Sequence, residues 1–158
     1  MPIPIVFDTL LFLKKNTLAL ISILVLAIFF SFFNHRGIAL SDEYMYSFNA
    51  WNIANGTFEL SPSAFSNRFG MLLPMASLIK QLGAGYQVLS FWSLMTFLLL
   101  LLANYYFCNF YYSKVALLST LFLALNPALL QLSADVSQDL VMCSFSTIAV
   151  FILWRTQS

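Results

Sequence analysis

Two adjacent carboxylates, Asp42 and Glu43, follow the first long apolar stretch of a chain in which only 8% of the residues are charged. A carboxylate at the edge of a membrane domain can accept a proton from a hydroxyl group, or can hold a hard cation through its oxygen atoms. The pair also fits the first turn of a helix, where each acid would contribute about 0.3–1 kcal/mol at an exposed position. Asp139, at the start of the last apolar stretch, has the same two explanations, because Ser137 before it is a candidate N-cap.

The composition indicates that these acids lie beside a membrane. The chain has 158 residues, of which 61% are hydrophobic, and a soluble domain would carry about 25% charged residues. Six acidic and seven basic residues nearly cancel, so the charge balance gives no indication of a nucleic-acid partner. We therefore expect an all-α integral membrane protein.

Four apolar stretches are long enough for transmembrane helices, which need about 17–25 residues. They are residues 17–33, 86–108, 115–133 and 138–154. A fifth stretch, residues 69–82, contains Pro74 and as a helix would reach only about 21 Å, against a hydrocarbon core of about 30 Å. We expect two surface helices in the first outer loop instead, over about 42–55 and 68–82, the first ending at Asn55-Gly56.

The distribution of basic residues sets the expected orientation, because cytoplasmic loops favour Lys and Arg. With four spans and a cytoplasmic N-terminus, the inner cations are Lys14, Lys15, Lys114 and Arg155, and the outer ones are Arg36, Arg68 and Lys80. The same arrangement puts four acids together on the non-cytoplasmic side, namely Asp42, Glu43, Asp135 and Asp139. A fifth span would separate the first two acids from the last two by the bilayer.

The order of these features resembles the N-terminal part of the GT-C membrane glycosyltransferases, closest to the bacterial protein O-mannosyltransferase and aminoarabinose transferase relatives. The matching stretches are "SDEYMYSFNAWNIANGTF", "NRFGMLLPMASLIKQLG", "FYYSKVALLSTLFLALNPALL" and "SADVSQDLVMCSFS". The resemblance covers the chain from about residue 17. It implies that residues 1–158 are one transmembrane module, the N-terminal fragment of a longer enzyme in a bacterial inner (plasma) membrane.

The resemblance also implies an activity. A sugar would pass from a polyprenyl-phosphate donor to a lipid, glycan or protein acceptor on the extracytoplasmic face. Asp42 matches the first acidic position of the family, the general base or a carboxylate linked to a divalent metal ion. Glu43 matches its neighbour near the acceptor, and Asp139 matches the acid at the start of the fourth span. Arg68 is a candidate for the donor phosphate, although its position also suits a cation that extends to the membrane interface.

A non-enzymatic alternative remains: a small polytopic scaffold, an assembly partner or a fragment of a transporter. Asn126-Pro127 could kink the third span as a transporter requires. Transport is disfavoured because no ionisable residue falls in the middle of an expected span, where ion and proton pathways usually have one.

Overall fold

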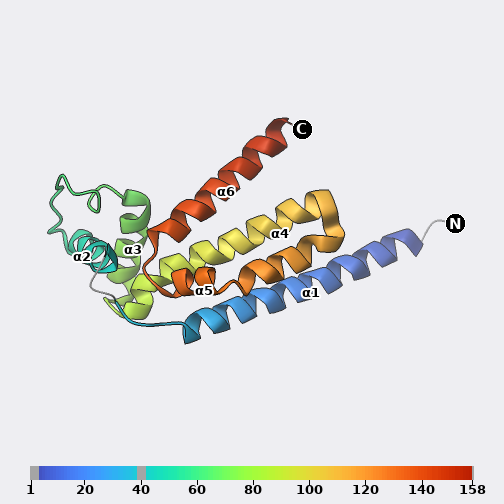
Figure 1. The fold of residues 1–158 in the computed structure, drawn as a ribbon, viewed down its shortest axis with the longest axis horizontal. Coiled ribbons are helices and arrows are strands. Elements are labelled where there is room, and N and C mark those ends of the chain that lie inside the picture. The colour runs from blue at the N-terminus through green and yellow to red at the C-terminus, as the bar shows by residue number, and fades with distance from the viewer. Residues whose placement is uncertain (1–3, 39–41, 158) are drawn as a thin grey trace.

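The computed structural model describes residues 4–38 and 42–157, with side chains for 16–38 and 42–156. These residues form six α-helices and no strand. The helices are α1 (Pro4–Phe33), α2 (Asp42–Asn55), α3 (Phe69–Leu82), α4 (Tyr86–Ala124), α5 (Pro127–Ala134) and α6 (Gln138–Gln157) (Figure 1). The expected all-α class is therefore confirmed.

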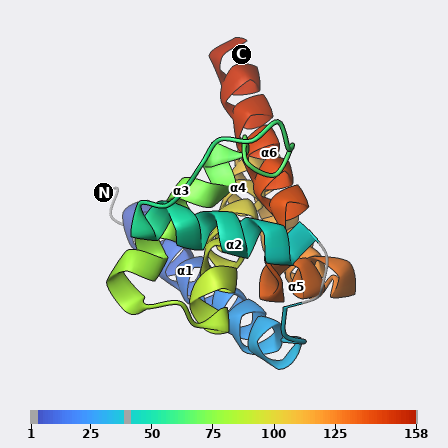
Figure 2. The same cartoon turned by 90° about the vertical axis from the view of Figure 1, so that its left-hand side faces the viewer.

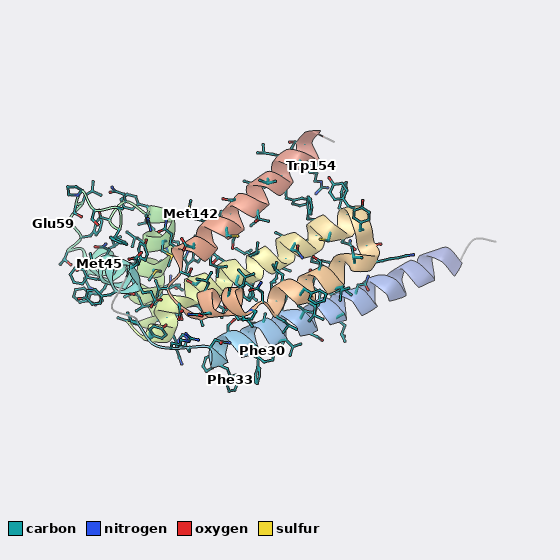
Figure 3. All side chains as sticks on the ribbon, viewed as in Figure 1. Phe30, Phe33, Met45, Glu59, Met142 and Trp154 are labelled. Atoms are coloured by element: carbon teal, nitrogen blue, oxygen red, sulfur yellow. The ribbon has the colours of Figure 1, made fainter. Side chains whose placement is uncertain are left out.

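Three of the described helices are long and apolar enough to span a membrane. Their apolar stretches are Asn16–Phe33, Tyr86–Ala124 and Gln138–Thr156, with mean hydropathies of 2.3, 1.8 and 1.4. Large apolar side chains cover their outward faces: Phe33 is 72% exposed, Met142 58% and Trp154 58% (Figure 3). Such an exposed apolar surface is costly in water and suits lipid, which indicates a membrane-embedded protein.

Helix α4 is a hairpin of two arms. At Tyr112 the backbone leaves helical geometry, with φ −144° and ψ 73°, and the chain turns back on itself (Figure 1). Asn104 Nδ2 on the first arm donates hydrogen bonds to Ser119 Oγ at 3.2 Å and Thr120 Oγ1 at 3.1 Å on the second. In a straight helix these residues would be more than about 20 Å apart, so the hydrogen bonds require the reversal.

The stretch 115–133, expected to be one transmembrane helix, is divided between two helices. The second arm of α4 ends at Ala124, and a new helix, α5, begins at Pro127. Asn126 explains the break, because its side chain accepts hydrogen bonds from the backbone N–H groups of Ala128 at 3.0 Å and Leu129 at 3.3 Å. Pro127 has no N–H to contribute to the preceding helix and suits the first position of the next one.

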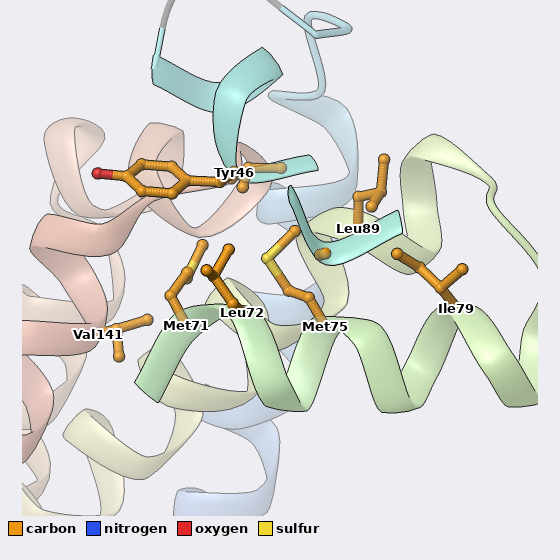
Figure 4. Close-up of a cluster of buried hydrophobic side chains, with 9 residues drawn as sticks. Tyr46, Met71, Leu72, Met75, Ile79, Leu89 and Val141 are labelled. Atoms are coloured by element: carbon orange, nitrogen blue, oxygen red, sulfur yellow. The ribbon is translucent and has the colours of Figure 1, made fainter. Parts of the chain in front are cut away.

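Helices α2 and α3 cover one end of the bundle. Helix α2 lies across that end (Figure 2) and packs against α3. The core between these two helices and the neighbouring ends of α4 and α6 consists of Tyr46, Ala50, Met71, Leu72, Met75, Ile79, Leu89, Val136 and Val141 (Figure 4). Helices are present over both of these expected ranges, and each ends next to a glycine in the left-handed region, Gly56 at φ 72° and Gly83 at φ 87°.

A second core joins α1, both arms of α4, α5 and α6. It consists of Ile23, Ala27, Phe97, Leu100, Leu101, Ala124, Leu130 and Leu140. Ala27 and Ala124 are fully buried, and such small residues let membrane helices approach closely. Ser31 on α1 and Ser133 on α5 share a hydrogen bond of 2.6 Å between their hydroxyl oxygens. These contacts fix α5, and with it the segment from 135 to 137 that leads into α6.

Candidate functional site

An open polar pocket of about 390 Å³ lies where α2, the start of α3 and the α5–α6 connection meet. Its walls are Asp42, Glu43, Tyr46, Arg68, Gln131, Leu132, Asp135, Val136, Ser137, Gln138 and Asp139. The structure therefore brings together all four residues selected from the sequence, Asp42, Glu43, Arg68 and Asp139, from segments nearly a hundred positions apart. We call this the acidic pocket.

Three of its carboxyl groups stand at helix N-termini. Asp42 and Glu43 occupy the first turn of α2, and Asp139 the first turn of α6. Asp42 and Asp139 are exposed and Glu43 is half-buried. From the sequence Ser41, directly before Asp42, is a candidate N-cap of α2, but it lies outside the described residues. The expected cap at Ser137 is confirmed, because its hydroxyl accepts the backbone N–H of Leu140 at 3.3 Å.

The fourth carboxyl group, on Asp135, is buried, with 8% of the residue exposed. The hydroxyl of Tyr86, at the start of α4, donates a hydrogen bond of 3.4 Å to Asp135 Oδ1. Burial raises the pKa of Asp135 above its ordinary value, and the Tyr86 hydrogen bond and the charges of Arg36 and His35 offset part of the rise. A carboxylate with a raised pKa is a stronger base, so Asp135 suits proton transfer better than an exposed acid does.

Tyr46 on α2 links Arg68 to the start of α6 at the pocket wall. Its ring is 2% exposed, and its hydroxyl points out of the apolar cluster (Figure 4). That hydroxyl donates to Gln138 Oε1 at 2.5 Å and accepts a hydrogen bond from Arg68 Nη1. The Arg68 guanidinium also stacks on aromatic rings, 5.5 Å from the centroid of Tyr46 and 5.7 Å from that of Phe65. Arg68 is thus held at the pocket wall by polar and aromatic contacts.

An apolar crevice of about 310 Å³ adjoins the acidic pocket between α1, α4 and α5. It is lined mainly by Ile28, Phe32, Phe91 and Leu94, with His35 and several hydroxyl groups among them. The Tyr86 hydroxyl connects the two spaces, because it lies 3.4 Å both from the carbonyl oxygen of Ala134, which lines the crevice, and from Asp135 Oδ1. We call this space the apolar crevice.

Among the residues whose side chains are described, no three His, Cys, Asp or Glu side chains come close enough to hold a metal ion together. One or two carboxylates can nevertheless hold Mg²⁺ together with substrate phosphates. The divalent ion expected at Asp42 therefore stays a prediction.

Among the polar residues of the pocket, Asp135, Tyr46 and Gln138 were not predicted as site residues, although Asp135 was expected on the same side of the membrane as the other acids. The sequence did contain one indication for Asp135: it is an acid four positions before Asp139, and it does not lie at the start of a helix, where an acid would stabilise the N-terminus. Tyr46 had none, because it looks like one more aromatic residue of an amphipathic helix. Its burial follows from the packing of α2 on α3.

No protein-family model, no curated protein and no solved structure matches this chain. Chemically, the pocket combines exposed acids, one buried base and one ordered guanidinium beside an apolar crevice.

Proposed function

We propose that this chain is a module of a membrane glycosyltransferase, which transfers a sugar from a polyprenyl-phosphate donor to a hydroxyl group of a lipid, glycan or protein acceptor. The observation that carries the proposal is the acidic pocket: four carboxyl groups and Arg68 surround one open space at the end of an apolar bundle. Acids can receive the proton of an acceptor, and a guanidinium can bind a phosphate.

In the proposed reaction the acceptor oxygen attacks the anomeric carbon of the sugar as the bond to the phosphate oxygen breaks. The polyprenyl phosphate leaves as an anion, so it needs no proton, and Arg68 would stabilise its charge. The acceptor proton passes to a carboxylate. Asp42 is one candidate base, and Asp135 is a second because burial raises its pKa.

The apolar crevice supports the choice of a lipid-linked donor. A polar pocket beside an apolar space suits a ligand with a charged head and a hydrocarbon tail. The crevice lies between α1 and α4, which are among the helices long enough to span a membrane, so an isoprenoid chain could enter it from the bilayer.

The proposed topology has four crossings with a cytoplasmic N-terminus. The crossings are α1, the first arm of α4, the second arm of α4 continued by α5, and α6. The third crossing is broken at Asn126, yet residues 113–124 and 127–134 together would extend about 30 Å, the thickness of the hydrocarbon core. The acidic pocket would then face the outside of a bacterial plasma membrane.

The proposal can be tested by donor binding and by sugar transfer. The purified chain in vesicles is given a photoreactive polyprenyl-phosphate sugar carrying a tritium label, and cross-linking and label transfer to added acceptors are measured. We expect cross-linking that excess polyprenyl phosphate competes away and polyprenol does not. Arg68→Gln should weaken it, whereas Glu59→Gln, on the exposed loop between α2 and α3, should not.

The role of Asp42 and Asp135 as the general base is tested by measuring the rate of sugar transfer. Loss of a general base typically lowers a rate by about 10²–10⁴-fold, so Asp42→Asn and Asp135→Asn, compared at equal donor binding, identify which carboxylate takes the proton. Cross-linking that polyprenol competes as well as its phosphate does, or that Arg68→Gln leaves unchanged, would contradict the proposal and favour a non-enzymatic membrane protein.

A further inference from the structure

A second feature lies at the opposite end of the bundle, between α4 and α6. The two helices diverge toward the C-terminus of α6 (Figure 1), and a groove of about 500 Å³ runs along one side of their contact. Its walls are Leu99, Leu102, Ala103, Tyr106, Asn109 and Phe110 on α4, and Ile148, Phe151, Ile152 and Arg155 on α6. We call this the α4–α6 groove.

The groove is apolar along most of its length and polar at one end. The α4 wall runs from Leu99 to Phe110, about 16 Å along a helix. Its deeper part is aliphatic and aromatic, while Asn109 and Arg155 line the end nearest the α4 kink and the α6 C-terminus. The Arg155 guanidinium lies 6.0 Å from the centroid of the Phe110 ring, a contact that keeps the cation beside the groove.

Arg155 is the charged residue among those that line the α4–α6 groove. Residues 106–118 and 148–156 include Lys114 and Arg155 and no Asp or Glu. A recess of about 320 Å³ on the other side of the α4–α6 contact shares Ala103 and Phe151 with the groove, but only uncharged residues line it. Unlike this recess, the α4–α6 groove has a cation, Arg155, at one end.

We propose that the α4–α6 groove is a binding site for an anionic phospholipid. One acyl chain lies along the apolar wall between Leu99 and Phe151, and the phosphate of the head group binds the Arg155 guanidinium. Basic pockets between membrane helices bind anionic head groups in this way, and each basic side chain near the surface contributes about a fivefold preference. The site is separate from the acidic pocket, which lies at the other end of the bundle.

The test measures lipid selectivity of the whole chain in vesicles of phosphatidylcholine. Spin-labelled phosphatidylglycerol and spin-labelled phosphatidylcholine are compared by the fraction that the protein immobilises. We expect the chain to favour phosphatidylglycerol, and Arg155→Gln to lower that preference about fivefold. Lys114→Gln removes a cation from the same end outside the groove and should lower it much less.

A second variant tests the groove itself and leaves every charge in place. Leu99 is 39% exposed and lines only this groove, so Leu99→Trp should obstruct the acyl chain and also lower the preference. Leu118→Trp, at a 53% exposed position that lines neither space, is the matched control. Circular dichroism checks that all variants are folded.

Three outcomes would overturn the proposal. One is equal immobilisation of the two lipids by the unmodified chain. Another is an equal effect of Arg155→Gln and Lys114→Gln, which would mean attraction by diffuse charge without a site. The third is cross-linking of two chains through cysteines placed along the groove, which would make a second copy the occupant.

Discussion

Among single residues, burial separates Asp135 from the other carboxyl groups of the acidic pocket. Asp42 and Asp139 are exposed to solvent at helix N-termini, where positive dipoles favour their charge. Asp135 lies at the C-terminal end of α5, in a buried position, with Tyr86 as its hydrogen-bond donor. Burial disfavours its charged form there, so function and stability should oppose each other at this residue.

Asp135→Asn should stabilise the protein at neutral and alkaline pH. Burial raises the pKa of Asp135 in the folded protein, so its contribution to stability is complete below the ordinary pKa of about 4 and is lost as the pH rises through the raised value. We expect the variant to have a higher free energy of unfolding than the unmodified protein at high pH, with no gain near pH 4. Thermal unfolding in detergent across this range measures the difference.

The control for this prediction is Glu59→Gln, which removes a carboxylate at an exposed loop position and should leave the pH dependence unchanged. A stabilisation of Asp135→Asn that persisted at low pH would mean that the carboxyl charge is not its cause.

Tyr46→Phe should weaken the wall of the pocket without opening a cavity. The ring stays, but Gln138 loses its donor and Arg68 loses the acceptor that holds its guanidinium. We expect a loss of about 1–2 kcal/mol in the free energy of unfolding, measured by denaturant titration, together with weaker donor binding. Tyr44→Phe, two residues away at a position of α2 that is 48% exposed, should change neither property. Equal effects of the two substitutions would show that the hydrogen bonds of the Tyr46 hydroxyl do not stabilise the pocket wall.

Among the helices, the α4 hairpin depends on a small polar cluster inside the bundle. Asn104 joins the two arms through Ser119 and Thr120. Hydrogen bonds between membrane helices contribute on average about 0.6 kcal/mol and at most about 1.7 kcal/mol.

Asn104→Leu should therefore lower the free energy of unfolding by about 1–2 kcal/mol for the pair of hydrogen bonds. Steric-trapping or denaturant measurements in detergent micelles give this value. Asn109→Leu, at an exposed position farther along the same arm, is the matched control and should have a smaller effect. Unchanged stability of Asn104→Leu would show that apolar packing alone holds the arms together.

The helices themselves were largely predictable from the sequence, and their interruptions less so. The expected ends of α2 at Asn55 and of α3 at Leu82 agree with the structure, because a glycine directly follows each helix. At Asn126-Pro127 the sequence indicated a kink and not a helix boundary, because hydropathy remains high across it; the Asn126 cap places the boundary there. The selected acids meet in one pocket, but Tyr46 and Asp135 owe their roles to tertiary packing, which no local pattern encodes.

For the whole molecule, the two ends of the bundle differ in charge. The acidic pocket and helices α2 and α3 are at one end, and Lys114 and Arg155 are at the other, near the α4 kink and the C-terminus of α6. Because Lys and Arg are favoured in cytoplasmic loops, this asymmetry predicts that the acidic pocket faces outward.

Cysteine labelling measures the orientation directly. Single cysteines replace Asp42, Lys114 or Asp139 in a chain that lacks Cys108 and Cys143, and intact cells are treated with a thiol reagent that cannot cross the membrane. Cysteines at 42 and 139 should react in intact cells, because both positions are exposed at the pocket, and the one at 114 should react only after permeabilisation. Reaction at 42 without reaction at 139 would place the bilayer between the two acids, and then they could not serve one acceptor. Reaction at 114 alone would mean that the molecule has the opposite orientation, with the acidic pocket facing the cytoplasm. Nucleotide sugars are present there, so a lipid-linked donor would not be needed.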